Sequence, residues 1–372
     1  MGIRIATILG TRPEAIKMAP VIRALEGDSA FDQLFIVTGQ HRELLDQVLE
    51  LFSLQPTHDL NIMQEGQQLD EILSRSLVEL GRIVREEKPA CVLVHGDTST
   101  TLAGALAGFY NRIPVGHVEA GLRTVDRFLP YPEEINRRLV DEVASYYFCP
   151  TASAAENLST AGLTEGEVLV TGNTVVDAVR MAAALPQQPP QELVSFAQRF
   201  PEYVVVTAHR RENWGEPLQR IGKALASFAR SNDDVGIAVC LHPNPLLRER
   251  LEPLLGGLEN VLLTPAPDYG AFVKLMQGAW FILTDSGGIQ EEACALEKFV
   301  LVLREHTERP EAVEAGFAKI IGTASQRIET QMEYALNAVR AGKLPPHGAP
   351  NPFGDGHAAD RIVEFLKKKL SQ

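Results

Sequence analysis

Residues 280–293 read WFILTDSGGIQEEA, and this stretch decides the fold class. The apolar run 280–284 is typical of a buried strand, and the glycine turn DSGG at 285–288 ends it. From Ile289 onward the residues are expected to open a helix. A strand joined to a helix by such a turn is the repeating unit of a parallel sheet covered by helices.

The same alternation extends outward in both directions. Short apolar runs are separated mostly by amphipathic patterns that are typical of helices. The first half of the chain predicts strands at 3–9, 34–38, 91–95, 114–118, 145–149 and 168–171. The second half predicts strands at 203–208, 235–241, 261–264, 280–284, 299–303 and 319–321. The chain is therefore expected to form two doubly wound, Rossmann-like α/β domains.

A proline-rich stretch at 185–190, LPQQPP, interrupts this pattern and is interpreted as a linker. We expect an N-terminal domain at 1–185 and a C-terminal domain at 191–355, with the last helix, 356–372, reaching back to complete the first. Doubly wound sheets bind ligands beyond the carboxyl ends of their strands. A ligand cleft is therefore expected between the two domains.

Composition excludes several classes of protein. The 372 residues carry 35 Lys plus Arg against 48 Asp plus Glu, a net charge of −13, which is the wrong sign for binding nucleic acid through its phosphates. The apolar stretch 1–9 is too short to span a membrane and lacks the features of a secretion signal, so a cytoplasmic protein is expected. The 4 cysteines lie far apart without C-x-x-C spacing, which is typical of reduced, buried thiols.

Familiar cofactor and metal motifs are missing from the sequence. No predicted strand is followed by G-x-G-x-x-G, and no G-x-x-x-x-G-K-[ST], D-x-D or H-E-x-x-H pattern occurs. These patterns bind dinucleotides, nucleotide phosphates or metal ions. We therefore expect neither a cofactor nor a metal ion.

Several polar groups follow predicted strands, where a phosphate would be bound. The turn 285–288 suits an anion at a helix start, although Ser286 acting simply as a helix N-cap explains it equally well. Arg12 and Lys17 follow the first strand and are suited to phosphate oxygens, with solvated charges at a helix start as the alternative. His209 opens the basic string HRREN, which suits a diphosphate, with a salt-bridged loop as the alternative.

Carboxylates show the same placement. Asp97 and Glu119 each follow a predicted strand, and Glu133 opens a helix. Three carboxylates near the strand ends of one sheet are suited to general acid and base catalysis. Each one alone is also explained as a helix cap or a surface charge, so the functional interpretation depends on their co-location.

Eight strings of residues follow one another in a set order: GTRPEAIKMAP, HGDTSTT, VGHVEAGLRT, PEEINRR, TGNTV, HRREN, TDSGGIQEEA and TERPEAV. With these strings the chain resembles, over nearly its whole length, the non-hydrolysing UDP-N-acetylglucosamine (UDP-GlcNAc) 2-epimerases. The resemblance implies a GT-B-like fold, an isomerase activity and no cofactor. It also implies a homodimer whose small-molecule partners are UDP-GlcNAc, UDP-N-acetylmannosamine (UDP-ManNAc) and UDP.

The resemblance assigns UDP binding mainly to the second domain. His209 is implied to lie near the diphosphate, Phe272 near the uracil and Glu292 on the ribose. Arg309 is implied to lie close by. The phosphates are implied to rest on three residues of the glycine turn, Ser286, Gly287 and Gly288.

The first domain is implied to handle the sugar and the chemistry. The residues that match these positions of the family are Arg12, Lys17, Asp97, Glu119, Glu133 and Arg137. The implied catalytic residues are Asp97, Glu119, Glu133 and His209.

Some relatives carry a second, regulatory UDP-GlcNAc site. The residues that fall near it here are Gln40, His41, Gln67, Arg210 and His242. The sequence departs from the family's pattern at two places. Gly66 stands where some regulated relatives have Arg, and Pro267 stands where relatives often have a polar residue beside the uracil. Because proline has no N–H, a base contact there would use its carbonyl oxygen.

The implied reaction is a reversible epimerisation at C2, and chemistry restricts its route. No carbonyl group acidifies the C2 hydrogen, so its direct removal by a carboxylate faces a very large barrier. If UDP leaves C1 first, the oxocarbenium-like centre acidifies this hydrogen, and its loss gives 2-acetamidoglucal, to which UDP adds back. The family's product supplies bacterial cell-surface polysaccharide. The alternatives are a hydrolysing 2-epimerase, a GT-B glycosyltransferase and a non-catalytic sensor that binds a nucleotide sugar without turnover.

Overall fold

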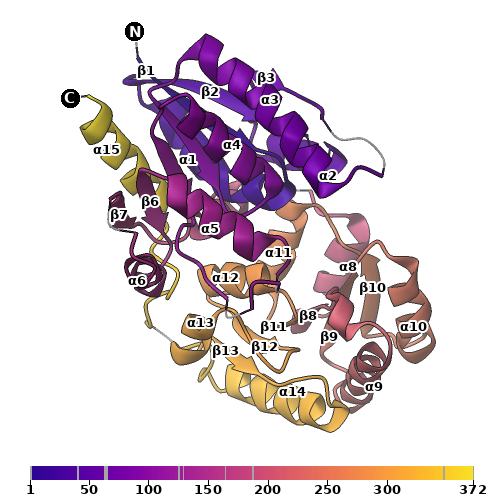
Figure 1. Ribbon diagram of the computed structural model, residues 1–372. Helices are drawn as coiled ribbons and strands as arrows, with labels where there is room; N and C mark the ends of the chain where they lie inside the picture. Colours follow the sequence, from indigo (N-terminus) through magenta and orange to yellow (C-terminus); the bar gives the residue numbers. More distant parts are fainter. Residues whose placement is uncertain are drawn as a thin grey trace. The chain divides into compact units, whose positions relative to one another are not determined.

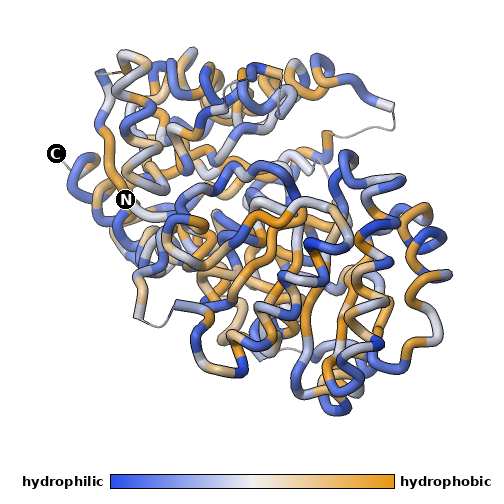
Figure 2. Tube along the Cα trace, turned by 90° about the horizontal axis from the view of Figure 1, so that it is seen from below, coloured by the Kyte–Doolittle hydropathy of each residue, from blue (hydrophilic) through white to orange (hydrophobic). Residues whose placement is uncertain are grey.

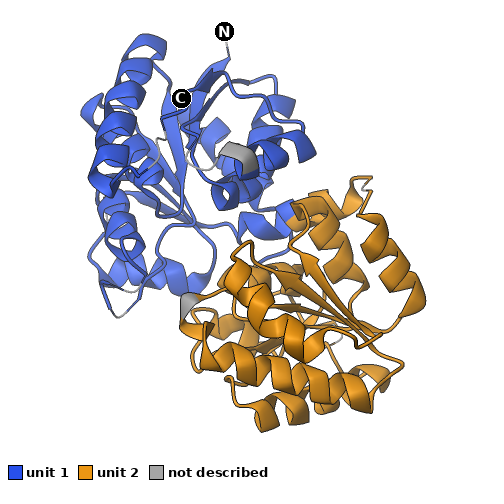
Figure 3. Ribbon diagram, turned by 90° about the vertical axis from the view of Figure 1, so that its right-hand side faces the viewer, with its two compact units in different colours: residues 1–178, 354–372 blue, residues 179–353 orange. Residues whose placement is uncertain are grey.

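The structure is a computed structural model that describes residues 2–39, 42–62, 66–124, 126–128, 130–163, 165–186, 188–346 and 348–371. The chain divides into two compact units, which are described separately (Figure 3). Unit 1 contains Met1–Ala178 and Gly354–Gln372, and unit 2 contains Val179–Phe353.

Unit 1 is built on a parallel sheet that has seven strands within the described residues, in the order β3-β2-β1-β4-β5-β6-β7 (Figure 1). Its strands are β1 (Ile3–Leu9), β2 (Phe31–Val37), β3 (His58–Asp59), β4 (Cys91–His95), β5 (Val115–Val118), β6 (Tyr146–Cys149) and β7 (Glu167–Val170). The strand order reverses on either side of β1, because β2 pairs with one edge of β1 and β4 with the other. Such a switch point is where doubly wound sheets bind ligands.

The helices of unit 1 alternate with these strands. They are α1 (Arg12–Gly27), α2 (Arg42–Leu51), α3 (Leu69–Glu87), α4 (Ser99–Tyr110), α5 (Glu133–Val143), α6 (Ala152–Thr160), α7 (Thr174–Ala184, which crosses into unit 2) and α15 (Ala358–Leu370). Helix α15 packs against α1, far away in the sequence. Lys367 binds Asp28 at 2.8 Å, and the backbone N–H of Ala359 donates to Asp177 at 3.0 Å.

Unit 2 repeats the plan with a parallel sheet of six strands in its described part, in the order β10-β9-β8-β11-β12-β13. Its strands are β8 (Tyr203–Thr207), β9 (Gly236–Leu241), β10 (Val261–Pro265), β11 (Phe281–Thr284), β12 (Phe299–Val302) and β13 (Ala318–Ile320). Its helices are α8 (Gln191–Arg199), the short 3-10 helix η1 (Arg211–Asn213), α9 (Glu216–Ser231), α10 (Pro245–Leu255), α11 (Tyr269–Gly278), α12 (Gly287–Ala295), α13 (Pro310–Glu314) and α14 (Ser325–Arg340).

Hydrophobic burial explains why these segments form these elements. The central strands β4, β8 and β11 are buried along their whole length, which requires apolar residues on both faces. Figure 2 shows hydrophobic residues concentrated along the strands and hydrophilic residues on the outer turns of the helices. The two parallel sheets with flanking helices confirm the predicted α/β class.

The strand predictions were least accurate at β2 and β3. Strand β2 begins at Phe31, three residues before the apolar run, because Asp32 and Gln33 continue the pairing with β1 although they are polar. Strand β3 is only two residues long and was not predicted. It pairs with the end of β2 at the sheet edge, where so short a segment gives no periodic signal.

Candidate active site

The carboxyl ends of β1, β4 and β5 lie next to one another in unit 1 and collect the predicted first-domain residues. Lys17 on α1 forms an ion pair with Glu119, which follows β5, and both side chains are about nine-tenths buried. The side-chain amide of Asn173 donates to the same Glu119 oxygen at 3.1 Å. Glu119 also has a φ of +66°, a strained conformation for a residue with a side chain. The ion pair and the amide hold its carboxylate in one place.

Asp97, which follows β4, is held by two residues of α5. Arg137 donates to the Asp97 carboxylate at 2.6 Å, and the side chain of Asn136 donates to the Asp97 carbonyl at 2.9 Å. The structure thus brings together Asp97 and Arg137, which the sequence analysis named separately. A hydrogen bond between a guanidinium and a carboxylate is charge-assisted and therefore short and strong.

Glu133, the first residue of α5, has a different environment. Burial raises the pKa of its carboxyl group, the nearby Asp97 raises it further, and Arg137 opposes both. Its Oε2 atom is buried and has no hydrogen-bond partner in the described part of the chain. A carboxyl group whose pKa is raised keeps its proton at a higher pH than an ordinary glutamate does. This property suits a general acid.

In unit 2, the fully buried Asp285 organises the loop after β8. Its carboxylate accepts the backbone N–H of His209 at 3.0 Å, the backbone N–H of Arg210 at 2.9 Å and the side-chain amide of Asn213 at 2.8 Å. Burial lowers the pKa of His209, Arg210 and His242 lower it further, and Asp285 opposes them. The imidazole of His209 is thus favoured in its neutral form beside that of His242, 6.4 Å away between ring centroids.

The start of α12 is the predicted phosphate cradle. Ser286 caps the helix by accepting from the backbone N–H of Ile289, so the helix-cap interpretation is confirmed. A Cβ added at Gly287 would lie 3.9 Å from the guanidinium groups of both Arg210 and Arg309. Arg309 is itself ion-paired with the buried Glu291. The nearest atom to that Cβ is a carboxylate oxygen of Glu308, at 3.8 Å, and Glu308 is ion-paired with Arg210. The start of α12 thus lies beside two guanidinium groups, each paired with a carboxylate. A helix N-terminus with guanidinium groups beside it suits a diphosphate whether or not Ser286 also acts as a cap.

The other predicted residues are placed as follows. Arg12 begins α1 and is half-buried, and Gln67 lies just before α3. Phe272 on α11 and Glu292 on α12 are both largely buried. Gln40 and His41 lie outside the described residues.

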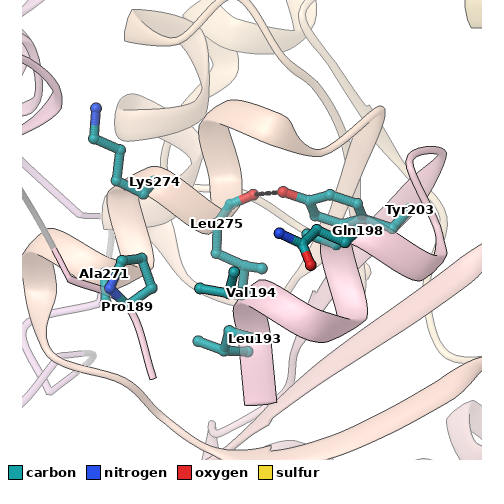
Figure 4. Close-up of a pocket in the computed structure, with 9 residues that line it drawn as sticks. Pro189, Leu193, Val194, Gln198, Tyr203, Ala271, Lys274 and Leu275 are labelled. Atoms are coloured by element: carbon teal, nitrogen blue, oxygen red, sulfur yellow. Dashed lines mark hydrogen bonds between the residues drawn. The ribbon is translucent and has the colours of Figure 1, made fainter. Parts of the chain in front are cut away.

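A cavity of about 310 Å³ lies elsewhere in unit 2, between α8 and α11. It is lined mainly by apolar residues such as Leu193 and Val194, and the hydroxyl of Tyr203 at its edge donates to the Leu275 carbonyl at 2.8 Å (Figure 4). None of the predicted site residues lines it. This cavity is therefore distinct from the candidate active site.

The described residues show neither a metal-binding cluster nor a membrane-spanning helix. They contain no group of three or more His, Cys, Asp or Glu side chains arranged to hold a metal ion. They also contain no helix that is both long enough and apolar enough to cross a membrane.

Comparison with known proteins gives the family. The sequence profile of the UDP-N-acetylglucosamine 2-epimerases matches residues 23–367. The chain belongs to this family. It is 48% identical to the UDP-N-acetylglucosamine 2-epimerase of Salmonella typhimurium, over 98% of each chain. The family resemblance inferred from the eight strings is confirmed.

Solved structures of epimerases agree with this. A putative UDP-N-acetylglucosamine 2-epimerase from Listeria monocytogenes superposes with a TM-score of 0.92 at 40% identity, covering 100% of this chain and 97% of that one. The UDP-GlcNAc 2-epimerase of Neisseria meningitidis, solved with UDP-GlcNAc bound, gives 0.87 at 42% identity, covering 98% and 100%. The predicted pair of Rossmann-like, GT-B-like domains is thereby confirmed.

In this epimerase fold, sequence reasoning missed two buried carboxylates that organise loops. Besides Asp285, Glu14 accepts the backbone N–H of Thr11 at 2.7 Å with one oxygen. With the other oxygen it accepts the hydroxyls of Thr98 at 2.8 Å and Thr101 at 2.9 Å. Glu14 thus ties the start of α1 to the start of α4. The spacing Thr11-x-x-Glu14, a capping box, was the signal that could have found it.

His95, the last residue of β4, was also missed. It is 4% exposed, and its Nε2 lies 3.7 Å from the Glu119 carboxylate. Neither ring nitrogen has a hydrogen-bond partner among the residues that the structure describes. No local pattern separates His95 from the apolar residues of β4, because its neighbour Glu119 follows the next strand, β5, and only the sheet brings the two together.

Proposed function

We propose that this chain is a non-hydrolysing UDP-GlcNAc 2-epimerase that interconverts UDP-GlcNAc and UDP-ManNAc. The family membership and the Neisseria relative that was solved with UDP-GlcNAc bound support this substrate. The observation that carries the proposal is the contrast among three carboxyl groups of unit 1. Asp97 and Glu119 are held by cations, while burial favours the protonated form of Glu133.

The first half of the reaction breaks two bonds. The C1–O bond breaks and UDP takes the electron pair, while a carboxylate removes the hydrogen from C2. The electrons of the C2–H bond form the C1=C2 double bond of 2-acetamidoglucal. Donors at the start of α12 would stabilise the negative charge that develops on UDP, without the need for water to reorganise.

The second half reverses these steps on the opposite face. A protonated carboxyl group gives a proton to C2, and an oxygen of the UDP diphosphate attacks C1. Two groups in opposite protonation states are needed at once, one as base and one as acid. Asp97 and Glu119 are proposed as the candidates for the base and Glu133 for the acid. Because the three carboxyl groups interact electrostatically, each proton gain or loss is a property of the three groups together and not of one residue.

The residues of unit 2 are proposed to hold UDP. His209, Arg309 and the turn 286–288 would contact the diphosphate, Phe272 the uracil and Glu292 the ribose. A neutral imidazole still carries one N–H group, so a neutral His209 can donate a hydrogen bond to a phosphate oxygen. A regulatory UDP-GlcNAc site that uses Gln67, Arg210 and His242, together with Gln40 and His41, is proposed as a separate property, and sigmoidal initial rates would reveal it.

The proposed assembly is a homodimer, supported by exposed apolar side chains on three neighbouring helices. Val78 on α3, Phe109 and Tyr110 on α4, and Leu139 on α5 are each between 47% and 66% exposed. Helix α4 packs against both α3 and α5, so the helices that carry these residues are neighbours in unit 1 (Figure 1). Light scattering should give twice the mass of 40.8 kDa, and Tyr110→Asp should reduce it toward one chain.

Proton NMR of the purified protein with UDP-GlcNAc alone tests the proposed activity. The expected product is UDP-ManNAc, formed without NAD and after EDTA treatment, and it should feed cell-surface polysaccharide synthesis. Free N-acetylmannosamine with UDP would instead identify a hydrolysing enzyme, and no product without an acceptor would identify a glycosyltransferase.

Isotopes test the route. Substrate labelled with heavy oxygen at the C1 bridge should scramble the label into non-bridging positions, and product formed in D₂O should carry deuterium at C2. If neither label moves and no glucal is trapped while UDP-ManNAc still forms, the elimination route is wrong.

A further inference from the structure

A buried chain of hydrogen bonds leads from the core of unit 1 to the residue before Asp97. His117 lies within β5, and its side chain is fully buried. Its Nδ1 lies 2.6 Å from the Asp141 carboxylate, and its Nε2 lies 2.8 Å from the carbonyl oxygen of Gly96. Arg123 binds the other Asp141 oxygen at 2.6 Å. His117 lies within the string VGHVEAGLRT, but the sequence alone indicates no role for it.

The direction of these hydrogen bonds follows from their partners. A carbonyl oxygen only accepts, so His117 must donate from Nε2 to Gly96. Burial alone would raise the pKa of Asp141, but the charges of His117 and Arg123 outweigh it and hold the pKa below its usual value. Asp141 is therefore an ionised acceptor for Nδ1. The ring of His117 is fixed at both nitrogens, and with it the position of the Gly96 carbonyl.

The position of Gly96 affects that of Asp97 directly. It has a φ of +70°, and its carbonyl belongs to the peptide group that continues into Asp97. The Asp97 carbonyl is held by Asn136 and the Asp97 carboxylate by Arg137, both from α5. The backbone N–H of Gly96 donates to the Val118 carbonyl at 3.0 Å, and the bond from His117 holds the carbonyl oxygen of the Gly96–Asp97 peptide group itself.

We propose that His117 is a positioning residue for the epimerisation: its bond to the Gly96 carbonyl keeps the Asp97 carboxylate beside Arg137 and near Glu133. This inference rests on the proposed function, because it requires Asp97 to act in the reaction. A carboxylate displaced by about 1 Å can cost on the order of 100-fold in rate while substrate binding survives.

Two substitutions separate the two bonds of His117. The amide nitrogen of Gln reaches the place of Nε2, so His117→Gln keeps a donor to Gly96. The amide nitrogen of Asn reaches only the place of Nδ1, so His117→Asn keeps a donor to Asp141 and loses Gly96. Both variants place an uncharged amide in the same buried site, and each is therefore the matched control of the other.

The test measures kcat, KM and the Kd for UDP, with the active sites counted by UDP binding. We expect kcat to fall roughly 10- to 100-fold in H117N and much less in H117Q, with the Kd for UDP unchanged in both. Should H117N not fold, His117→Ser replaces it, because Ser also cannot reach Gly96 and leaves room for water beside Asp141. A purely structural role would lower folded protein in both variants and leave kcat per site equal.

A double-mutant cycle with Asp97→Asn completes the test. If His117 acts through Asp97, the H117N substitution should cost almost nothing more in the D97N background. Equal losses in both backgrounds, or a loss in H117Q as large as in H117N, would overturn the inference. Wild-type activity in D97N would instead overturn the proposed function, so the two failures are distinguishable.

Discussion

Asp141 in unit 1 and Asp285 in unit 2 are both fully buried carboxylates, but they are stabilised in different ways. Asp141 is bound by two basic side chains, His117 and Arg123. Asp285 is bound mainly by N–H groups, two of them from the backbone. In unit 1 the buried carboxylate thus fixes ionisable side chains in place, whereas in unit 2 it fixes backbone N–H groups of a loop. The first suits proton transfer, and the second suits the binding of an anion.

The largest expected effect tests whether the chemistry belongs to unit 1 alone. Asp97→Asn, Glu119→Gln and Glu133→Gln should each lower kcat by about 10²- to 10⁴-fold, because a general acid or base acts in the transition state. The Kd for UDP, measured by calorimetry, should stay constant. Glu142→Gln, an exposed residue of the same helix as Glu133, is the control and should leave kcat unchanged. A large change in UDP affinity in the three variants would contradict the assignment of proton transfer to unit 1 and of UDP binding to unit 2.

The next effect concerns stability. Asp141→Asn should lower the free energy of unfolding by about 3 kcal/mol, because it removes one charge from a buried, paired group. The pKa of Asp141 is lowered in the folded state, so its stabilisation is present above the usual pKa of Asp and is lost as the pH falls through the lowered value. Urea titrations at several pH values should show a shallower acid limb in D141N than in the wild type. Parallel limbs would contradict this account.

A smaller effect is expected in unit 2. Asp285→Asn keeps the size of the side chain but weakens the acceptor for the N–H groups of His209 and Arg210, so the loop after β8 should loosen. We expect UDP affinity to fall roughly 10- to 100-fold, about 1.4 kcal/mol for each factor of ten. Asp234→Asn, an exposed residue paired with Arg340, is the control. Unchanged UDP binding in D285N would show that this carboxylate does not organise the diphosphate site.

The smallest effect is a change in pH dependence. Burial raises the pKa of Glu133, so the stability it contributes is present below the ordinary pKa of Glu and is lost as the pH rises through the raised value. Glu133→Gln should remove this loss, and the stability curves of the two proteins should separate toward higher pH. The kcat/KM of the wild type should decrease through the same range, because the general acid becomes ionised. Curves that stay parallel would show that Glu133 titrates normally.

Sequence patterns predicted the parts of this protein that depend on local chemistry. Hydrophobic periodicity and turn residues predicted most strands. Asp97, Glu119 and His209 were selected because each follows a predicted strand. The sequence could not show that Lys17 binds Glu119, because 102 residues separate them and only the sheet order brings them together. It also could not distinguish Glu133 from Asp97, because burial and neighbouring charges determine which carboxyl group keeps its proton.

Helix α15 has a consequence for synthesis of the chain on the ribosome. Residues 354–372 belong to unit 1, whereas the whole of unit 2 precedes them in the sequence. Ile362 and Leu366 of α15 are fully buried, and Phe365 packs edge-on against Tyr146 and Phe148 at 5.4 and 5.5 Å between ring centroids. The growing chain therefore releases all of unit 2 before the last piece of unit 1 emerges. Unit 2 can therefore finish folding while unit 1, which contains Asp97, Glu119 and Glu133, still lacks part of its core.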